Sequence, residues 1–111
     1  MRTSIVAVPL LAALAALPGT AASPGDPVAG KRLFATTCAG CHPAGGNAIV
    51  PDAPLKGAVF ARKFADDARI VAVVRNGIKG TAMPPFSVKA VSDADLKSMI
   101  AYLRTLTPRG K

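Results

Sequence analysis

The sequence Cys-Ala-Gly-Cys-His at residues 38–42 constrains this chain most, because it contains both cysteines and the only histidine of the 111 residues. Cys38 and Cys41 stand three residues apart, so on one helical turn their thiols face the same side. There each thiol can add to one vinyl group of a haem, and the adjacent His42 can turn its ring toward the iron. We therefore expect one covalently bound haem c, attached through Cys38 and Cys41 with His42 as an iron ligand.

Three other uses of a Cys-x-x-Cys pair fit the rest of the sequence less well. A tetrahedral zinc site takes four ligands, whereas this chain offers two cysteines and one histidine. A thioredoxin-like disulfide is expected in a strand–helix–strand setting, and no alternating strand pattern flanks the motif. A structural disulfide would close a loop of only four residues, which constrains the unfolded chain little.

The second axial ligand of the iron is left to methionine or a deprotonated lysine, because no second histidine exists. Met1 would be lost with an N-terminal leader, and Met99 lies in an apolar helical stripe, where a core role is expected. Met83 lies in the loop Gly80-Thr-Ala-Met-Pro-Pro-Phe86, isolated among small residues and followed by a proline that fixes the chain. A methionine in such a loop is ordinarily a gap-filler or a surface residue. Here we expect the metal ligands to be His42 and Met83.

Two segments carry the end signals of helices. The first opens at Asp26-Pro27, a good N-cap followed by proline, and continues into the Cys38 region. The second is expected over about 66–76, between an acidic start and the stop Gly77. Its apolar run at 70–74 would also suit a strand, but the ends favour a helix.

A third and clearer helix begins at Ser92, which can form a capping box with Asp95. Apolar residues then repeat with helical spacing: Leu96, Met99, Ile100 and Leu103. Residues 42–64, by contrast, are rich in glycine and proline, and so long a loop is unusual in a compact domain unless it is functional. The chain has four phenylalanines, one tyrosine and no tryptophan to fill a core. We expect an all-α fold of three main helices whose long loops wrap the haem.

The N-terminus has the features of a secretory signal peptide. Arg2 precedes 13 uncharged residues, Ile5 to Leu17, and small residues follow at 20–23. This apolar run is shorter than the about 20 residues that span a bilayer, so a cleaved leader is favoured over an uncleaved anchor. We expect residues 1–22 to be removed and residues 23–111 to form one periplasmic domain without stable membrane insertion.

The charge of the chain is strongly basic, with 14 Lys and Arg against six Asp and Glu and a net charge of +8. The expected leader carries one charge, on Arg2, so the mature chain keeps +7. Basic residues near the cofactor would steer acidic redox partners, an attraction that salt screens: Lys56, Arg62, Lys63, Lys79 and Lys89. An ordinary solubilising surface is the simpler interpretation of any single lysine. Dispersed charge and few aromatic residues argue against nucleic-acid binding.

The sequence resembles the small monohaem class I cytochromes c, of the bacterial and photosynthetic electron-carrier type, over nearly all of residues 26–106. The features that match, in order, are Gly30 and Phe34 before the Cys-Ala-Gly-Cys-His motif, the Met83-Pro84 loop, and a final helix with Tyr102 and Leu103. The resemblance implies that Gly30 and Phe34 cross the final helix at Tyr102 and Leu103. Glycine supplies the physical reason, because it lets two backbones approach closely.

The resemblance also implies that a proline carbonyl, in the loop after the motif, accepts the second ring N–H of His42. Such a bond fixes the tautomer of a metal-binding histidine. Pro51 is favoured for this role, with Pro54 as the alternative. The tryptophan that many members have near the haem propionates has no counterpart here. Basic side chains could serve the propionates instead, and the candidates are Arg62, Lys63 and Arg69.

Together the resemblance and the ligands imply a periplasmic electron carrier rather than an enzyme. Histidine and methionine leave no open iron position, and a thioether ligand raises the reduction potential. Single electrons would then pass between redox protein partners, with the protein acting as a monomer. One alternative is a haem subunit of a dedicated periplasmic oxidoreductase complex. The other is a haem protein that binds peroxide, nitric oxide or carbon monoxide beside a labile Met83.

Overall fold

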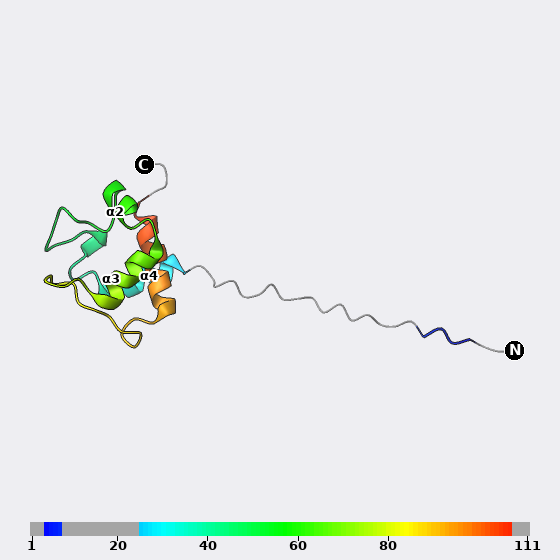
Figure 1. Ribbon diagram of the computed structural model, residues 1–111. Coiled ribbons are helices and arrows are strands. Elements are labelled where there is room, and N and C mark those ends of the chain that lie inside the picture. Colours follow the sequence, from blue (N-terminus) through cyan, green and yellow to red (C-terminus); the bar gives the residue numbers. More distant parts are fainter. Residues whose placement is uncertain (1–3, 8–24, 108–111) are drawn as a thin grey trace.

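The computed structural model describes residues 4–7 and 25–107, and the second range folds into helices joined by long loops (Figure 1). The elements are α1 (Pro27–Thr37), a 3-10 turn η1 (Pro43–Gly45), α2 (Ala58–Lys63), α3 (Asp67–Asn76) and α4 (Asp93–Thr105). No strand occurs within the described ranges. The all-α class is therefore confirmed, and the three longer helices coincide with the three that the sequence predicts, the apolar run at 70–74 included.

Each of these three helices begins at the side-chain cap expected from the sequence. Asp26 and Asp66 each accept a hydrogen bond, at 2.9 Å, from the backbone N–H two residues further on. Ser92 Oγ accepts one from the Asp95 N–H at 3.1 Å. At the other end of α3, Gly77 has a φ of 66°, a left-handed conformation that glycine adopts without a steric cost. Local sequence therefore fixes where these helices start and where α3 stops.

The core lies where α1 packs against α4. Gly30 makes this crossing close, because a Cβ at this position would overlap the backbone carbonyl of Ser98. One turn further along α1, the ring of Phe34 meets the ring of Tyr102 edge to face, with centroids 5.4 Å apart. Leu103 is buried in the same cluster. The helix crossing implied by the resemblance is therefore present.

The core is small, and its side chains are not completely buried. Its buried apolar side chains are Phe34, Phe60, Ile70, Val91, Leu96, Met99, Ile100 and Leu103, and among the described residues no large side chain is less than 2 % exposed. Apolar side chains of the loops are open to solvent: Ile49 is 58 % exposed and Ile78 is 45 % exposed. Side chains alone therefore cover the interior incompletely, as expected for a small domain whose core is completed by a bound group.

The short helix α2 differs from the expectation, because it lies inside the 42–64 stretch that the sequence indicates as loop. Gly57 precedes it with a φ of 90° and donates its N–H to Thr107 Oγ1 at 2.8 Å. Within α2, Phe60 is buried and stacks on Phe64, with ring centroids 5.1 Å apart. A helix of six residues has no room for the apolar periodicity by which longer helices are recognised.

No helix in residues 4–7 or 25–107 has the length and apolar character needed to cross a membrane. The expected leader at 1–22 lies mostly outside the described residues. Of that segment the structure describes 4–7, which are exposed and form neither helix nor strand.

Candidate functional site

The two cysteines and the histidine lie on one turn that continues α1 beyond Thr37. The Cys38 N–H donates to the Phe34 carbonyl at 2.8 Å, which carries the helical hydrogen bonding past the end of α1. The Cys38 carbonyl then accepts from the His42 N–H at 2.9 Å and from the Cys41 N–H at 3.2 Å. The structure therefore brings the three residues of the motif together on a single backbone turn.

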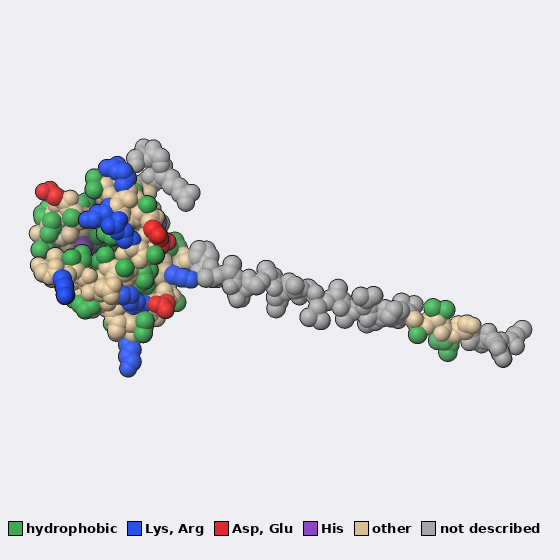
Figure 2. All heavy atoms as spheres, viewed as in Figure 1, with side chains coloured by type: hydrophobic (Ala, Val, Ile, Leu, Met, Phe, Trp, Pro, Cys, Tyr) green, Lys and Arg blue, Asp and Glu red, His purple; other side chains and the backbone are tan. Residues whose placement is uncertain are grey.

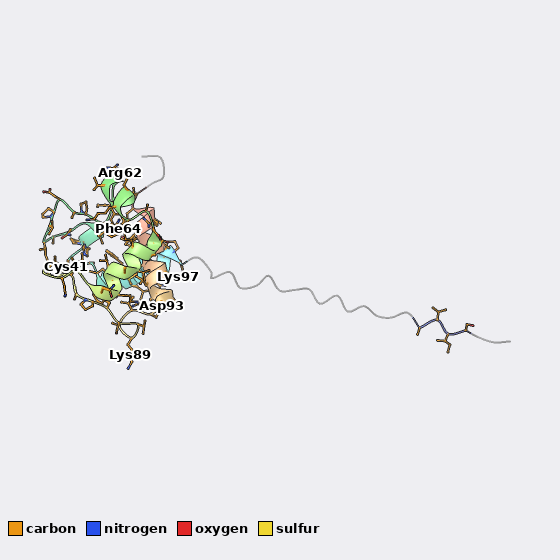
Figure 3. The ribbon with its side chains drawn as sticks, viewed as in Figure 1. Cys41, Arg62, Phe64, Lys89, Asp93 and Lys97 are labelled. Carbon is orange, nitrogen blue, oxygen red and sulfur yellow. The ribbon has the colours of Figure 1, made fainter. Side chains whose placement is uncertain are left out.

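Both thiols are free, and their surroundings differ. Cys38 is half-buried against the hydrophobic core, and this burial raises the pKa of its thiol above the ordinary value. Cys41 is exposed on the loop side of the molecule (Figure 3). One thiol thus lies next to the core and the other at the surface, and they form no disulfide with each other.

His42 is half-buried, and its Nδ1 lies 2.8 Å from the carbonyl oxygen of Gly46. A carbonyl oxygen only accepts hydrogen bonds, so Nδ1 carries the proton and donates it. The other ring nitrogen, Nε2, therefore keeps its lone pair for a metal ion. The structure gives this hydrogen bond to the Gly46 carbonyl. The role that the resemblance implies for Pro51, or for Pro54 as the alternative, stays a prediction.

A tight turn explains how the carbonyl of Gly46, only four residues after His42, reaches the imidazole ring. Ala44 has a φ of 51° and Gly45 a φ of 79°, and the Gly46 N–H donates to the Pro43 carbonyl at 2.9 Å. These left-handed conformations reverse the chain directly after the motif and bring the Gly46 carbonyl to the imidazole. The adjacent glycines were the available signal in the sequence, because glycine is the usual residue for such turns.

Pro51 instead lies exposed in a loop that Asn47 organises. The side-chain oxygen of Asn47 accepts from the Val50 N–H at 2.8 Å, and its amide nitrogen donates to the Ala53 carbonyl at 3.2 Å. The side chain of Asn47 thus spans both ends of the Pro51 turn. The loop is held by its own hydrogen bonds, which leaves the contact with the imidazole to Gly46.

Met83 lies half-buried in the loop between α3 and α4. Its carbonyl accepts from the Ile78 N–H at 3.1 Å, and its own N–H donates to Thr81 Oγ1 at 3.2 Å. Beyond it, the Phe86 N–H donates to a carbonyl of α3, that of Val74, at 2.8 Å. The loop Gly77–Phe86, called here the Met83 loop, therefore closes back onto the end of α3.

Basic side chains are spread over the visible face of the molecule (Figure 2). Lys and Arg side chains lie at several separate places on the face shown in Figure 2, and Lys89 points away from the body of the molecule in Figure 3. Lys63 and Arg69 flank the ring of Phe64, with charged groups 5.7 and 5.9 Å from its centroid. Arg62 lies in the last turn of α2 (Figure 3).

These donors together fit a c-type haem. One turn offers two free thiols and an imidazole whose Nε2 is available, and the Met83 loop offers a thioether. Met99 is only 4 % exposed in the core, so it is committed to packing. In the described part of the chain, no group of three or more His, Cys, Asp and Glu side chains could hold a metal ion by itself.

Comparison with known proteins identifies the family of this chain. The family model for cytochrome c oxidase, cbb3-type, subunit III matches residues 25–103. Cytochrome c6 of Synechocystis sp. is 38 % identical over 93 residues, which cover 83 % of this chain and 75 % of that protein. Cytochrome c6 of Picosynechococcus sp. is 35 % identical over 106 residues, covering 88 % of this chain and 87 % of that protein.

Solved structures show the same likeness in three dimensions. Cytochrome c6 from the diatom Phaeodactylum tricornutum superposes with a TM-score of 0.62 at 31 % identity, over 73 % of this chain and 93 % of that one. OmcF, an outer membrane cytochrome from Geobacter sulfurreducens, superposes with a TM-score of 0.59 at 33 % identity, over 71 % of this chain and 99 % of that one.

These matches cover almost the whole described domain, and each of these relatives is a cytochrome. They favour an electron-transfer haem protein over the two alternatives, a subunit of a dedicated complex and a ligand-binding haem protein. The chain therefore belongs to the cytochrome c family, as a small monohaem class I cytochrome c that transfers electrons through one covalently bound haem.

Proposed function

We propose that this protein is an exported one-electron carrier in which Cys38 and Cys41 attach the haem and His42 and Met83 ligate its iron. The observation that carries the proposal is the hydrogen bond from His42 Nδ1 to the Gly46 carbonyl. It fixes the tautomer that turns Nε2 into a ligand. Of the two methionines in residues 25–107, Met99 is buried in the core and Met83 lies outside it, which supports Met83 as the second ligand.

The ligands determine what this chain can do with an electron. With His42 and Met83 as its ligands, the iron of a bound haem would have no position left for a substrate, which is why we infer no enzymatic activity for this chain. The soft thioether of Met83 favours Fe(II) and raises the reduction potential. The bound haem supplies the one-electron couple of its iron. The backbone turn at 38–42 and the closed Met83 loop hold both ligands in place, which keeps rearrangement small when the charge changes.

The partners and location follow from the charge and the N-terminus. The mature chain, residues 23–111, carries a net charge of +7, which suits redox proteins with acidic docking surfaces. Removal of a leader at about residue 22 would release it as a monomer in the periplasm. N-terminal sequencing of the exported protein tests the cleavage site, and a mature chain that still begins at Met1 would refute it.

The ligand assignment is tested by redox titration of Met83→Ala, with Met99→Leu as the matched control. Loss of the thioether lowers the potential, on the order of 100 mV within the roughly 0.8 V that axial ligands span. Met99→Leu removes a sulfur atom from the core at nearly constant volume and leaves the potential unchanged. A Met83→Ala protein that keeps the potential of the unaltered protein would show that Met83 is not the ligand.

A further inference from the structure

Arg75, near the C-terminal end of α3, makes three contacts that the haem chemistry described above does not use. Its Nη1 donates to the Phe86 carbonyl at 3.2 Å and to the Val91 carbonyl at 2.7 Å. Its Nη2 donates to Asp93 Oδ1 at 2.6 Å. The side chain is only 19 % exposed, so these contacts are partly shielded from water and stronger than those of a surface arginine.

These contacts join the last residue of the Met83 loop to the beginning of α4. Phe86 closes the loop, Val91 is buried in the core at 3 % exposure, and Asp93 is the first residue of α4. Arg75 thus spans the chain on both sides of the 87–90 segment. The exit of the Met83 loop is tied to two helices through a single guanidinium group.

The beginning of the Met83 loop, at Gly77, is held by close backbone packing. A Cβ on Gly77 would lie 2.8 Å from the Met83 carbonyl and 2.8 Å from the Pro85 nitrogen, so the loop presses on the end of α3. Its tip is held less firmly. Gly80 has nothing within 4 Å of such a position, and the hydrogen bonds of Thr81 lie at the exposed surface. Resistance to opening therefore comes from the two ends of the loop, and Arg75 supplies the side-chain contacts at its exit.

We propose that Arg75 is a positioning residue for Met83: by holding the Phe86 and Val91 carbonyls, it restrains the loop and keeps the thioether on the iron. The inference rests on the proposed ligation by Met83. It predicts that a competing ligand displaces the methionine more readily when the guanidinium is lost. Two hydrogen bonds and an ion pair disappear together, and the carbonyls they served are left without that donor.

A second arginine in the chain provides a matched control. Arg104 on α4 also donates to a carboxylate at 2.6 Å, that of Asp67, and to the two carbonyls of Phe64 and Ala65. Its side chain is 32 % exposed. The contacts of Arg104 hold the connection between α2 and α3 and do not touch the Met83 loop. Asp67 and Asp93 are each the first residue of a helix, so their roles at the helix ends match as well.

The experiment titrates the oxidised holoprotein with imidazole and follows the weak far-red band of a methionine–iron bond. Arg75→Gln is expected to lower the imidazole concentration at half-conversion about tenfold, while Arg104→Gln stays within about twofold. Arg75→Lys, which keeps a charge but cannot hold three acceptors, falls between. An Arg75→Gln protein that resists imidazole like the unaltered protein would overturn the inference. So would equal weakening in the two Gln variants, because it would mark a general loss of stability.

Milder variants keep the test decisive if Arg75→Gln does not fold. Asp93→Asn removes only the ion pair of an aspartate that is 83 % exposed, and it should ease displacement about twofold. Asp67→Asn, whose carboxylate is 63 % exposed, should have no effect on displacement, and equal behaviour of these two variants would contradict the proposal. Absence of the far-red band in the unaltered protein would reject Met83 as the ligand, which is a failure of the proposed function and not of the role of Arg75 alone.

Discussion

Gly30 of α1 lies directly against Ser98 of α4, so close that a Cβ on the glycine would overlap the serine carbonyl. The Ser98 side chain also takes part in this contact, because its hydroxyl accepts the Asp26 N–H at 3.1 Å. The beginning of α1 is thereby tied to the middle of α4. This contact aligns the helix whose last turn continues into the Cys38–His42 site.

Replacing Gly30 with alanine should therefore destabilise the holoprotein by about 2 kcal/mol or more, because the added methyl group meets backbone that cannot move aside. Guanidinium chloride unfolding, followed by far-ultraviolet circular dichroism, measures the loss. Lys31→Ala, at an exposed position of the same helix, is the control. Equal stability of Gly30→Ala and the unaltered protein would contradict the close crossing.

The helices of this fold could be predicted because their signals are local. Asp26, Asp66 and Ser92 cap the helices that follow them in the structure as their sequence context indicates. The crossing of α1 and α4 was likewise available from the resemblance. By contrast, α2 depends on the burial of Phe60 and on a hydrogen bond from Gly57 to the distant Thr107. Neither the burial nor the hydrogen bond can be inferred from a segment of six residues.

Parts of the site escaped prediction for a related reason. The sequence pattern identifies Cys38, Cys41 and His42 by spacing, but the carbonyl beside the imidazole depends on backbone dihedrals. The conformations at 44 and 45 bring Gly46 back to the ring, whereas the resemblance pointed to Pro51. Arg75 had no signal at all, because its three acceptors lie 11 to 18 residues further along the chain.

Removal of both cysteines, as Cys38→Ala with Cys41→Ala, should abolish covalent haem and the stable fold together. The described core has no large side chain less than 2 % exposed, and a domain of this size has little stability to lose without a cofactor. Circular dichroism and haem staining of the denatured chain measure the two effects. Retention of a cooperative unfolding transition in a haem-free double variant would contradict this account of the core.

Arg104 and Asp67 should contribute unequally to stability although they form one ion pair. Asp67→Asn removes an exposed charge and should cost less than about 1 kcal/mol. Arg104→Gln also withdraws the donor from the partly buried Phe64 carbonyl, bonded at 2.6 Å, and should cost about 1–3 kcal/mol. Chemical unfolding of the two holoproteins compares them. A larger loss in Asp67→Asn would show that the ion pair, and not the carbonyl contact, holds the α2–α3 connection.

The basic charge of the protein should make its electron-transfer rates with small charged reagents depend on ionic strength. Oxidation by hexacyanoferrate(III), an anion, should slow as ionic strength rises, because salt screens its attraction to the basic polypeptide. A cationic cobalt(III) complex, used as the oxidant under the same conditions, should show the opposite trend. Stopped-flow rates between about 10 and 300 mM salt cover the range in which screening changes most. The same trend for both reagents would rule out electrostatic steering.

The most direct test of the central claim is the visible spectrum of the protein matured with haem-attachment machinery, recorded oxidised and reduced and followed by acid–acetone extraction. Attachment through Cys38 and Cys41 predicts that the haem stays with the polypeptide. Ligation by His42 and Met83 predicts sharp low-spin bands on reduction and a weak far-red band on oxidation. Haem that remains bound but gives a high-spin spectrum would contradict the Met83 ligand, and haem that is extracted would contradict the site itself.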